Sequence, residues 1–211
     1  MFNRQNSLRS FCELPKPDNS IDFFKKLKIE SEKFWEVTDI NRKIFGFQIQ
    51  NGTKWNKGLS ENELIEFQKD LKLEFPEELK NFYRVMNGLD KKGINVNGNN
   101  GEGISFKPIY YTYPIDLELI KENINWIYES NEVNIDLIEQ NEIPKIFPII
   151  GHRFLIVDEN KQILSMYGND IIYWSENISK LIATDIFNNI KNITDFESNE
   201  KNMKPIKFWL D

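Results

Sequence analysis

The sequence predicts an α+β fold in which helices flank an antiparallel sheet of about four to six strands. Helical apolar spacing comes first along the 211 residues. Four short apolar runs, separated by polar turns, then cluster between residues 147 and 174. This order is typical of α+β proteins with an antiparallel sheet.

The predicted elements begin with a helix. Residues 1–19 are polar and contain two prolines, so they predict a loose arm. Ser20 can cap a helix that runs to about Glu36. Lys43–Gln50 alternates loosely and predicts a short strand before the Asn51-Gly52 turn.

The clearest local pattern lies between residues 60 and 88. Ser60 and Glu63 have the spacing of a capping box at the start of a helix. Pro76 suits the first position of the next helix, where a missing N–H costs no hydrogen bond. Asn87-Gly88 is expected to form the left-handed end of that helix.

The second half supplies the sheet. Residues 90–103 predict a loop or hairpin tip, and Ile104–Tyr113 predicts a strand that Pro108 places at an edge or interrupts. A helix is expected from Asp116 to about Asn131. The expected strands are Phe147–Ile150, Phe154–Asp158, Ile163–Tyr167 and Ile171–Trp174, followed by a helix from Ser175 or Asn177 to about Ile190.

Composition limits the possible functions. Cys12 is the one cysteine and His152 the one histidine, which excludes a disulfide framework and disfavours a zinc site, so no metal or cofactor is expected. We find no apolar stretch typical of a signal peptide or a membrane span, so the expectation is a cytoplasmic protein that binds no membrane. A net charge of −6 disfavours nucleic-acid binding.

The negative charge is concentrated in one segment. Residues 116–142 hold eight acidic side chains and one basic side chain, whereas residues 1–57 hold 11 basic and 7 acidic ones. The acidic segment is either an ordinary solvated helix face or a surface for a basic partner, with aromatic anchors inside it. The candidate partner-binding residues are Asp116, Glu118, Glu122, Trp126, Tyr128, Glu129, Glu132 and Asp136.

No residue pattern indicates catalysis. His152 lies at an expected strand start or turn, without the Gly-x-Ser-x-Gly motif that would accompany a serine nucleophile. Asp158 and Asp170 fall beside expected turns, where aspartate accepts backbone hydrogen bonds. The glycine-rich stretch 98–103 lacks the Gly-Lys-Ser/Thr ending of a phosphate-binding loop. We therefore expect no catalytic residues.

Two blocks of sequence resemble a known family. The first extends from Trp55 through Gly58-Leu59-Ser60 to Asn87-Gly88, and the second from Phe147-Pro148-Ile149 to Trp174. Their order resembles the SUKH superfamily, whose members include yeast regulators of cell-wall glucan synthesis. The positions that resemble family motifs, with an expected structural role, are Trp55, Gly58, Pro76, Asn87, Gly88, Asp158, Gly168 and Asp170.

The resemblance implies a protein-binding module without catalysis. Bacterial members are mostly immunity proteins encoded beside polymorphic toxins, so the leading hypothesis is an immunity protein, a monomer or weak dimer, that neutralises a basic toxin such as a nuclease. The alternatives are an adaptor or regulator of cell-envelope or signalling proteins, and an enzyme whose site the sequence does not reveal. The implied division is a 1–50 extension, a 51–191 domain and a 192–211 tail.

Overall fold

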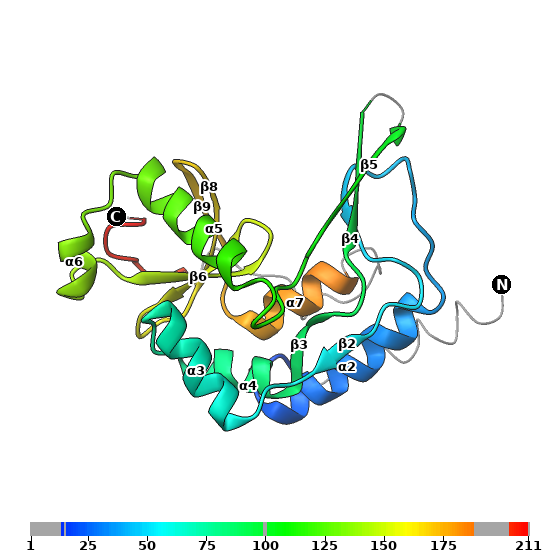
Figure 1. Ribbon diagram of the computed structural model, residues 1–211, viewed down its shortest axis with the longest axis horizontal. Helices are drawn as coiled ribbons and strands as arrows, with labels where there is room; N and C mark the ends of the chain where they lie inside the picture. Colours follow the sequence, from blue (N-terminus) through cyan, green and yellow to red (C-terminus); the bar gives the residue numbers. More distant parts are fainter. Residues whose placement is uncertain (1–13, 15, 99–100, 188–202, 211) are drawn as a thin grey trace.

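The computed structural model describes residues 14, 16–98, 101–187 and 203–210. Cys12, residues 188–190 of the expected last helix, and most of the expected arm and tail lie outside the described residues. The α+β prediction is confirmed. Figure 1 shows the arrangement of the elements, which are, in chain order, α2 (Ile21–Trp35), β1 (Gly46–Gln48), β2 (Trp55–Lys57), α3 (Glu61–Leu71), α4 (Glu77–Val85), β3 (Met86–Leu89), β4 (Gly93–Asn97), β5 (Gly103–Lys107), α5 (Leu117–Ser130), α6 (Ile135–Glu139), β6 (Lys145–Ile150), β7 (Arg153–Val157), β8 (Ile163–Tyr167), β9 (Asp170–Ser175) and α7 (Ile178–Phe187).

The largest sheet is an antiparallel meander in the order β6-β7-β8-β9. It contains all four strands expected near the end of the chain. The other described strands form two smaller antiparallel sheets, β1-β4-β5 and β2-β3. The segment expected to be a loop or hairpin tip, 90–103, contributes to a hairpin, because β4 pairs with β5 from the pair Gly93–Lys107 to the pair Asn97–Gly103.

Both faces of strands β6, β7 and β8 are largely buried, because alternate side chains of a strand point to opposite faces. On the edge strand β9, Ile172 and Trp174 are exposed on one face. Leu155 and Ile163 face a first core shared with α2, α3, α4 and α7. Phe154, Ile156 and Leu164 face a second core shared with α5 and α6. The sheet is therefore the layer between two groups of helices.

Helix α2 belongs to the main core. Ser20 caps it by accepting a hydrogen bond from the Phe23 N–H at 3.1 Å. The buried Trp55 indole donates to Ser31 Oγ at 2.8 Å, and its ring lies 5.5 Å from that of Trp35. The 1–50 extension remains a prediction about domain organisation, but its helix shares one core with residues of the expected domain.

The capping box at α3 is confirmed. The Ser60 side chain accepts from the Glu63 N–H, and the Glu63 carboxylate accepts from the Ser60 N–H at 2.8 Å. Pro76, expected at the first helical position, is instead the N-cap of α4, with φ −64° and ψ 157°. The chain enters α4 from an extended segment, so the Pro76 carbonyl already accepts from Leu79 and Lys80 while its ψ is not helical.

The Asn87-Gly88 prediction was wrong in detail. Helix α4 ends at Val85 and the chain continues directly into β3, so these two residues are part of a strand. The Asn87 side chain donates to the Tyr113 carbonyl at 2.8 Å and accepts from the Tyr113 N–H at 2.9 Å. Gly88 has φ +69°, and a Cβ there would meet Thr112 Oγ1 at 2.0 Å. The pair holds segment 112–113 against β3, a tertiary role that local sequence does not reveal.

Candidate partner-binding groove

A groove of about 790 Å³ opens between α5 and the β1-β4-β5 sheet. The end of α2 and helix α7 form its floor, and the β6–β7 turn contributes to the wall on the α5 side. Figure 1 shows α5 and the β4–β5 hairpin on opposite sides of the space above α7. The groove is thus built from elements that are far apart in the sequence.

Helix α5 forms one wall with an uncharged stripe. Leu119, Asn123 and Trp126 line the groove at spacings of four and three residues, which places them on one side of a helix. Ile120 and Ile127, one position further along, are fully buried in the cores beneath. Burial of the apolar stripe fixes the rotation of α5 and so turns Trp126 toward the groove.

Three aromatic side chains in the groove lining are exposed. Phe47 of β1 is 46% exposed, Trp126 of α5 38% and Tyr167 of β8 67%. The Trp126 and Tyr167 rings meet edge to face with centroids 5.2 Å apart. Large aromatic side chains that stay exposed beside a cavity are typical of protein-binding surfaces.

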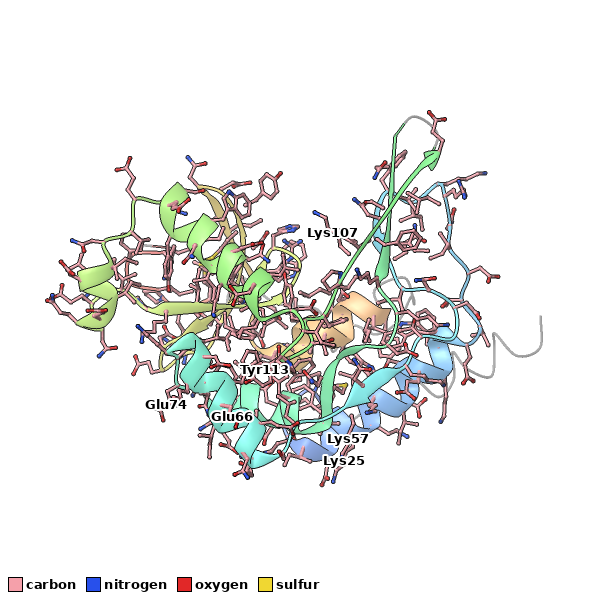
Figure 2. All side chains as sticks on the ribbon, viewed as in Figure 1. Lys25, Lys57, Glu66, Glu74, Lys107 and Tyr113 are labelled. Carbon is pink, nitrogen blue, oxygen red and sulfur yellow. The ribbon has the colours of Figure 1, made fainter. Side chains whose placement is uncertain are left out.

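The opposite wall comes from the small sheet. Phe47 of β1 lines this wall. Strand β1 is joined to β5 through β4, because Phe47 pairs with Asn95 of β4 and Asn95 pairs with Ser105 of β5. Lys107, at the end of β5, projects toward the space between the hairpin and α5 (Figure 2) and lines the groove. No hydrogen bond or ion pair of Lys107 occurs among the described residues.

The floor carries one carboxylate. Asp185 lies on α7 between the buried Ala183 and Ile186, yet its own side chain is exposed to the groove. The buried Tyr110 hydroxyl donates to Asp185 Oδ2 at 3.1 Å. The surrounding protein restricts hydration of the carboxylate and raises the pKa of Asp185 to about 6, although the Tyr110 hydrogen bond and Arg153 act in the opposite direction.

Arg153 and His152 lie beside the floor at the start of β7. The Arg153 guanidinium stacks 3.5 Å from the Trp174 ring centroid and donates to Ser165 Oγ. It makes no ion pair with Asp185, and no Lys or Arg of the described residues lies within ion-pair distance of that carboxylate. Desolvation, and then the positive charge of Arg153, lower the pKa of His152, whose ring lies 6.1 Å from Tyr167.

The structure divides the acidic segment into groups. Glu118, Glu122 and Glu129 are exposed and share a stripe of α5 next to the groove-lining stripe. Asp116 is bound locally, because its Oδ2 accepts from the Thr112 N–H at 2.8 Å. Glu132 and Asp136 are exposed on the α5–α6 connection and on α6, at the end of the molecule away from the hairpin (Figure 1).

The two aromatic residues expected as anchors face different directions. Trp126 lines the groove, whereas Tyr128 stacks on Trp209 in the second core, with ring centroids 6.2 Å apart. The tertiary structure does not bring Tyr128 to the groove. Sequence reasoning also missed Phe47, Tyr167, Lys107 and Asp185; for Asp185, the one available pattern was a carboxylate inside an apolar helix.

A family model described as the SMI1 / KNR4 family (SUKH-1) matches residues 58–196, more than half of the chain. The chain belongs to this family. No curated protein matches the chain closely enough to count as a relative. The match begins at Gly58, so α2 lies outside the matched region although it shares the SUKH-1 core.

Several SUKH-1 motif positions have visible structural roles. A Cβ at Gly58 would meet the Arg84 carbonyl oxygen at 2.0 Å, so only glycine lets the β2–α3 connection approach α4. Asp158 Oδ1 accepts from the N–H groups of Asn160 and Lys161 and stabilises the β7–β8 turn. Gly168 has φ +61° in the β8–β9 turn, and its carbonyl accepts from Asn131 Nδ2 at 3.0 Å.

The described part of the chain holds no group of three or more His, Cys, Asp or Glu side chains placed to hold a metal ion. Within the same residues, no helix is both long enough and apolar enough to cross a membrane.

Proposed function

We propose that this SUKH-1 protein is an immunity protein that binds a basic protein toxin through the groove and the acidic stripe of α5. The observation that carries the proposal is the open groove with three exposed aromatic side chains from three separate elements. The toxin class follows from charge complementarity with Glu118, Glu122 and Glu129. Nuclease toxins fit because they carry positive clefts for phosphates.

The exposed aromatic side chains of the groove and the acidic stripe of α5 have different expected roles. Aromatic side chains at the centre of an interface contribute most to its stability, so Trp126 and Tyr167 should slow dissociation. Exposed carboxylates at the rim act over longer distances and should mainly accelerate association. Aromatic anchors and rim carboxylates together account for toxin binding without any catalytic step.

The experiment is co-expression with the toxin domain encoded beside this gene, followed by binding kinetics on the purified pair. Trp126→Ala is expected to raise the dissociation rate at least about tenfold and to weaken growth protection. Ile65→Ala is the matched control, because Ile65 is 62% exposed on α3 and is absent from the groove lining. Equal effects of both substitutions, with folding verified by circular dichroism, would contradict the groove as the interface.

An adaptor or regulator of cell-envelope or signalling proteins would use the same groove with a different partner. The co-expression experiment separates the two functions. An adaptor would not bind the toxin that is encoded beside this gene and would give no growth protection, although its groove would still be folded.

One observation favours the enzyme alternative enough to test it: Asp185 and His152 both line the groove. A binding protein inhibits its toxin only up to one equivalent, whereas an enzyme inactivates many toxin molecules. We expect inhibition to end at a one-to-one ratio, and His152→Ala to leave protection intact. Inactivation by substoichiometric amounts would establish catalysis instead.

A further inference from the structure

The groove floor contains a charge arrangement that the proposed function does not require. Asp185 is a carboxylate on a helix in which Ala183, Ile186 and Phe187 are buried, and its one hydrogen-bond partner among the described residues is the Tyr110 hydroxyl. The nearby Arg153 is held by Ser165 and Trp174. No Lys or Arg among the described residues forms an ion pair with this carboxylate, which is exposed to the groove and can therefore pair with a cation from outside.

The walls above Asp185 suit a long cationic side chain. Trp126, Tyr111 and Phe47 line the groove and present aromatic surface, on which a guanidinium or an alkyl-ammonium side chain packs favourably. Asn123 and Tyr111 add polar atoms, already joined by a hydrogen bond of 3.2 Å. The carboxylate at the floor can then accept a charge-assisted hydrogen bond, bidentate if the donor is arginine.

We propose that the groove is a receptor for one basic side chain of the partner, an arginine or a lysine, which enters between Trp126 and Phe47 and pairs with Asp185. This inference rests on the proposed function for the identity of the partner, but not for the chemistry of the site. It makes Asp185 the residue that determines specificity, while the acidic stripe of α5 accelerates association.

The proposal implies a pH dependence. A bound cation favours the ionised carboxylate, so binding is strongest where Asp185 is already ionised, above its pKa of about 6. The other charged or titratable groups that line the groove are Asp39, Lys107, Tyr111, His152, Arg153 and Tyr167, and the Tyr110 hydroxyl contacts Asp185 from below. Protonation of His152 below neutral pH would also repel a cation, so the two contributions must be separated by substitution.

The test needs no toxin. The full chain, isotope-labelled for NMR, is titrated with Nα-acetyl-arginine amide, and separately with Nα-acetyl-citrulline amide, a neutral molecule of nearly the same shape. We expect the arginine probe to shift the Trp126 indole and Asp185 backbone resonances, and to bind at least about tenfold more tightly than the citrulline probe. Asp185→Asn should remove this preference, whereas Asp39→Asn, which removes a charge elsewhere in the groove lining, should retain it.

The pH arm uses the same probe. From pH 7 to pH 5 the affinity of the His152→Gln protein for the arginine probe should fall about tenfold, as expected from protonation of a carboxylate with a pKa of about 6. Equal binding of both probes, or an unchanged preference in Asp185→Asn, would overturn the proposal. So would tighter binding of Nα-acetyl-glutamate amide, which would make Lys107 the binding charge.

The two proposals fail separately. If the toxin binds but Asp185→Asn leaves its affinity unchanged, the receptor for a basic side chain is refuted and the immunity function stands. If the arginine probe binds at Asp185 but no toxin does, the immunity function is refuted and the receptor remains.

Discussion

At the residue scale, three positions show how one atom decides the local structure. Gly58 allows backbone contact with α4, Gly88 allows contact with Thr112, and Asn87 pairs with the Tyr113 backbone. The sequence marks all three as family-type positions. It does not identify the partners, because Arg84, Thr112 and Tyr113 each lie more than 20 residues away along the chain.

Gly58→Ala should destabilise the protein by about 1–3 kcal/mol, because the new Cβ meets backbone that cannot move without shifting α4. Gly151→Ala is the control: it meets open space, and only its φ of +52° opposes a side chain, at a cost of about 1–2 kcal/mol. Urea unfolding measures both. A Gly58→Ala protein as stable as wild type would show that the connection has room to move.

Asp185 gives a prediction for stability against pH. Because its pKa is raised in the folded state, the folded protein binds more protons than the unfolded chain between about pH 4 and pH 6. The folded state is therefore favoured while Asp185 is protonated: this contribution to the free energy of unfolding is fully present below the unfolded pKa and is lost as pH rises through the folded pKa. Asp185→Asn should therefore be more stable than wild type at pH 7, and the difference should shrink toward pH 4. Thermal unfolding across this range measures it; a constant difference would contradict the raised pKa.

At the element scale, local patterns predicted helices well because caps and apolar stripes are properties of neighbouring residues. Ser60 and Glu63 define the start of α3, and the stripe of α5 defines its buried side. The partition of the acidic residues between α5 and α6 was not predictable, since it depends on where each helix packs.

Ser60→Ala should cost about 1 kcal/mol, because it leaves the Glu63 N–H without its capping acceptor. Asn62→Ala is the control on the same turn, where the exposed side chain has no hydrogen bond among the described residues. Chemical denaturation of the two variants gives the comparison. Equal midpoints would count against the cap.

Two triple variants of equal charge separate the roles of α5 and α6. Replacing Glu118, Glu122 and Glu129 by glutamine should slow toxin association and flatten its salt dependence, because these residues flank the groove. The matched variant replaces Glu132, Asp136 and Glu139, which lie on the α6 side, and should retain most of the wild-type rate. Stopped-flow measurement of the association rate at two salt concentrations compares the two variants. A larger loss of rate in the α6 variant than in the α5 variant would move the interface to α6.

At the scale of the whole molecule, α2 and segment 203–210 are parts of the folded unit. Phe24 and Leu27 are fully buried in the core that contains Phe82, and Trp209 packs in the second core and donates to the Pro144 carbonyl at 2.9 Å. The SUKH-1 match covers neither segment.

A protein that begins at residue 51 should therefore not fold stably, because it exposes the core surface that α2 covers. Leu27→Ala, which keeps the helix and leaves a cavity, should cost about 2–5 kcal/mol. Lys25→Ala, on the exposed side of the same helix, is the control and should be nearly neutral. A stable, cooperatively folded 51–211 protein would show that α2 is an accessory element.

The sequence by itself determined the α+β class, the strands of the main sheet, the α3 cap and the family, because these follow from short-range spacing and from the order of patterns along the chain. The groove was decided by tertiary structure alone. Phe47, Trp126, Tyr167 and Asp185 are far apart in sequence, and each looks like an ordinary core or surface residue in its own segment. They meet because α5 packs on one face of the main sheet, while α7, on the other face, forms a floor with the end of α2. Long-range packing therefore selected which aromatic side chains stay exposed and left Asp185 without an ion pair among the described residues.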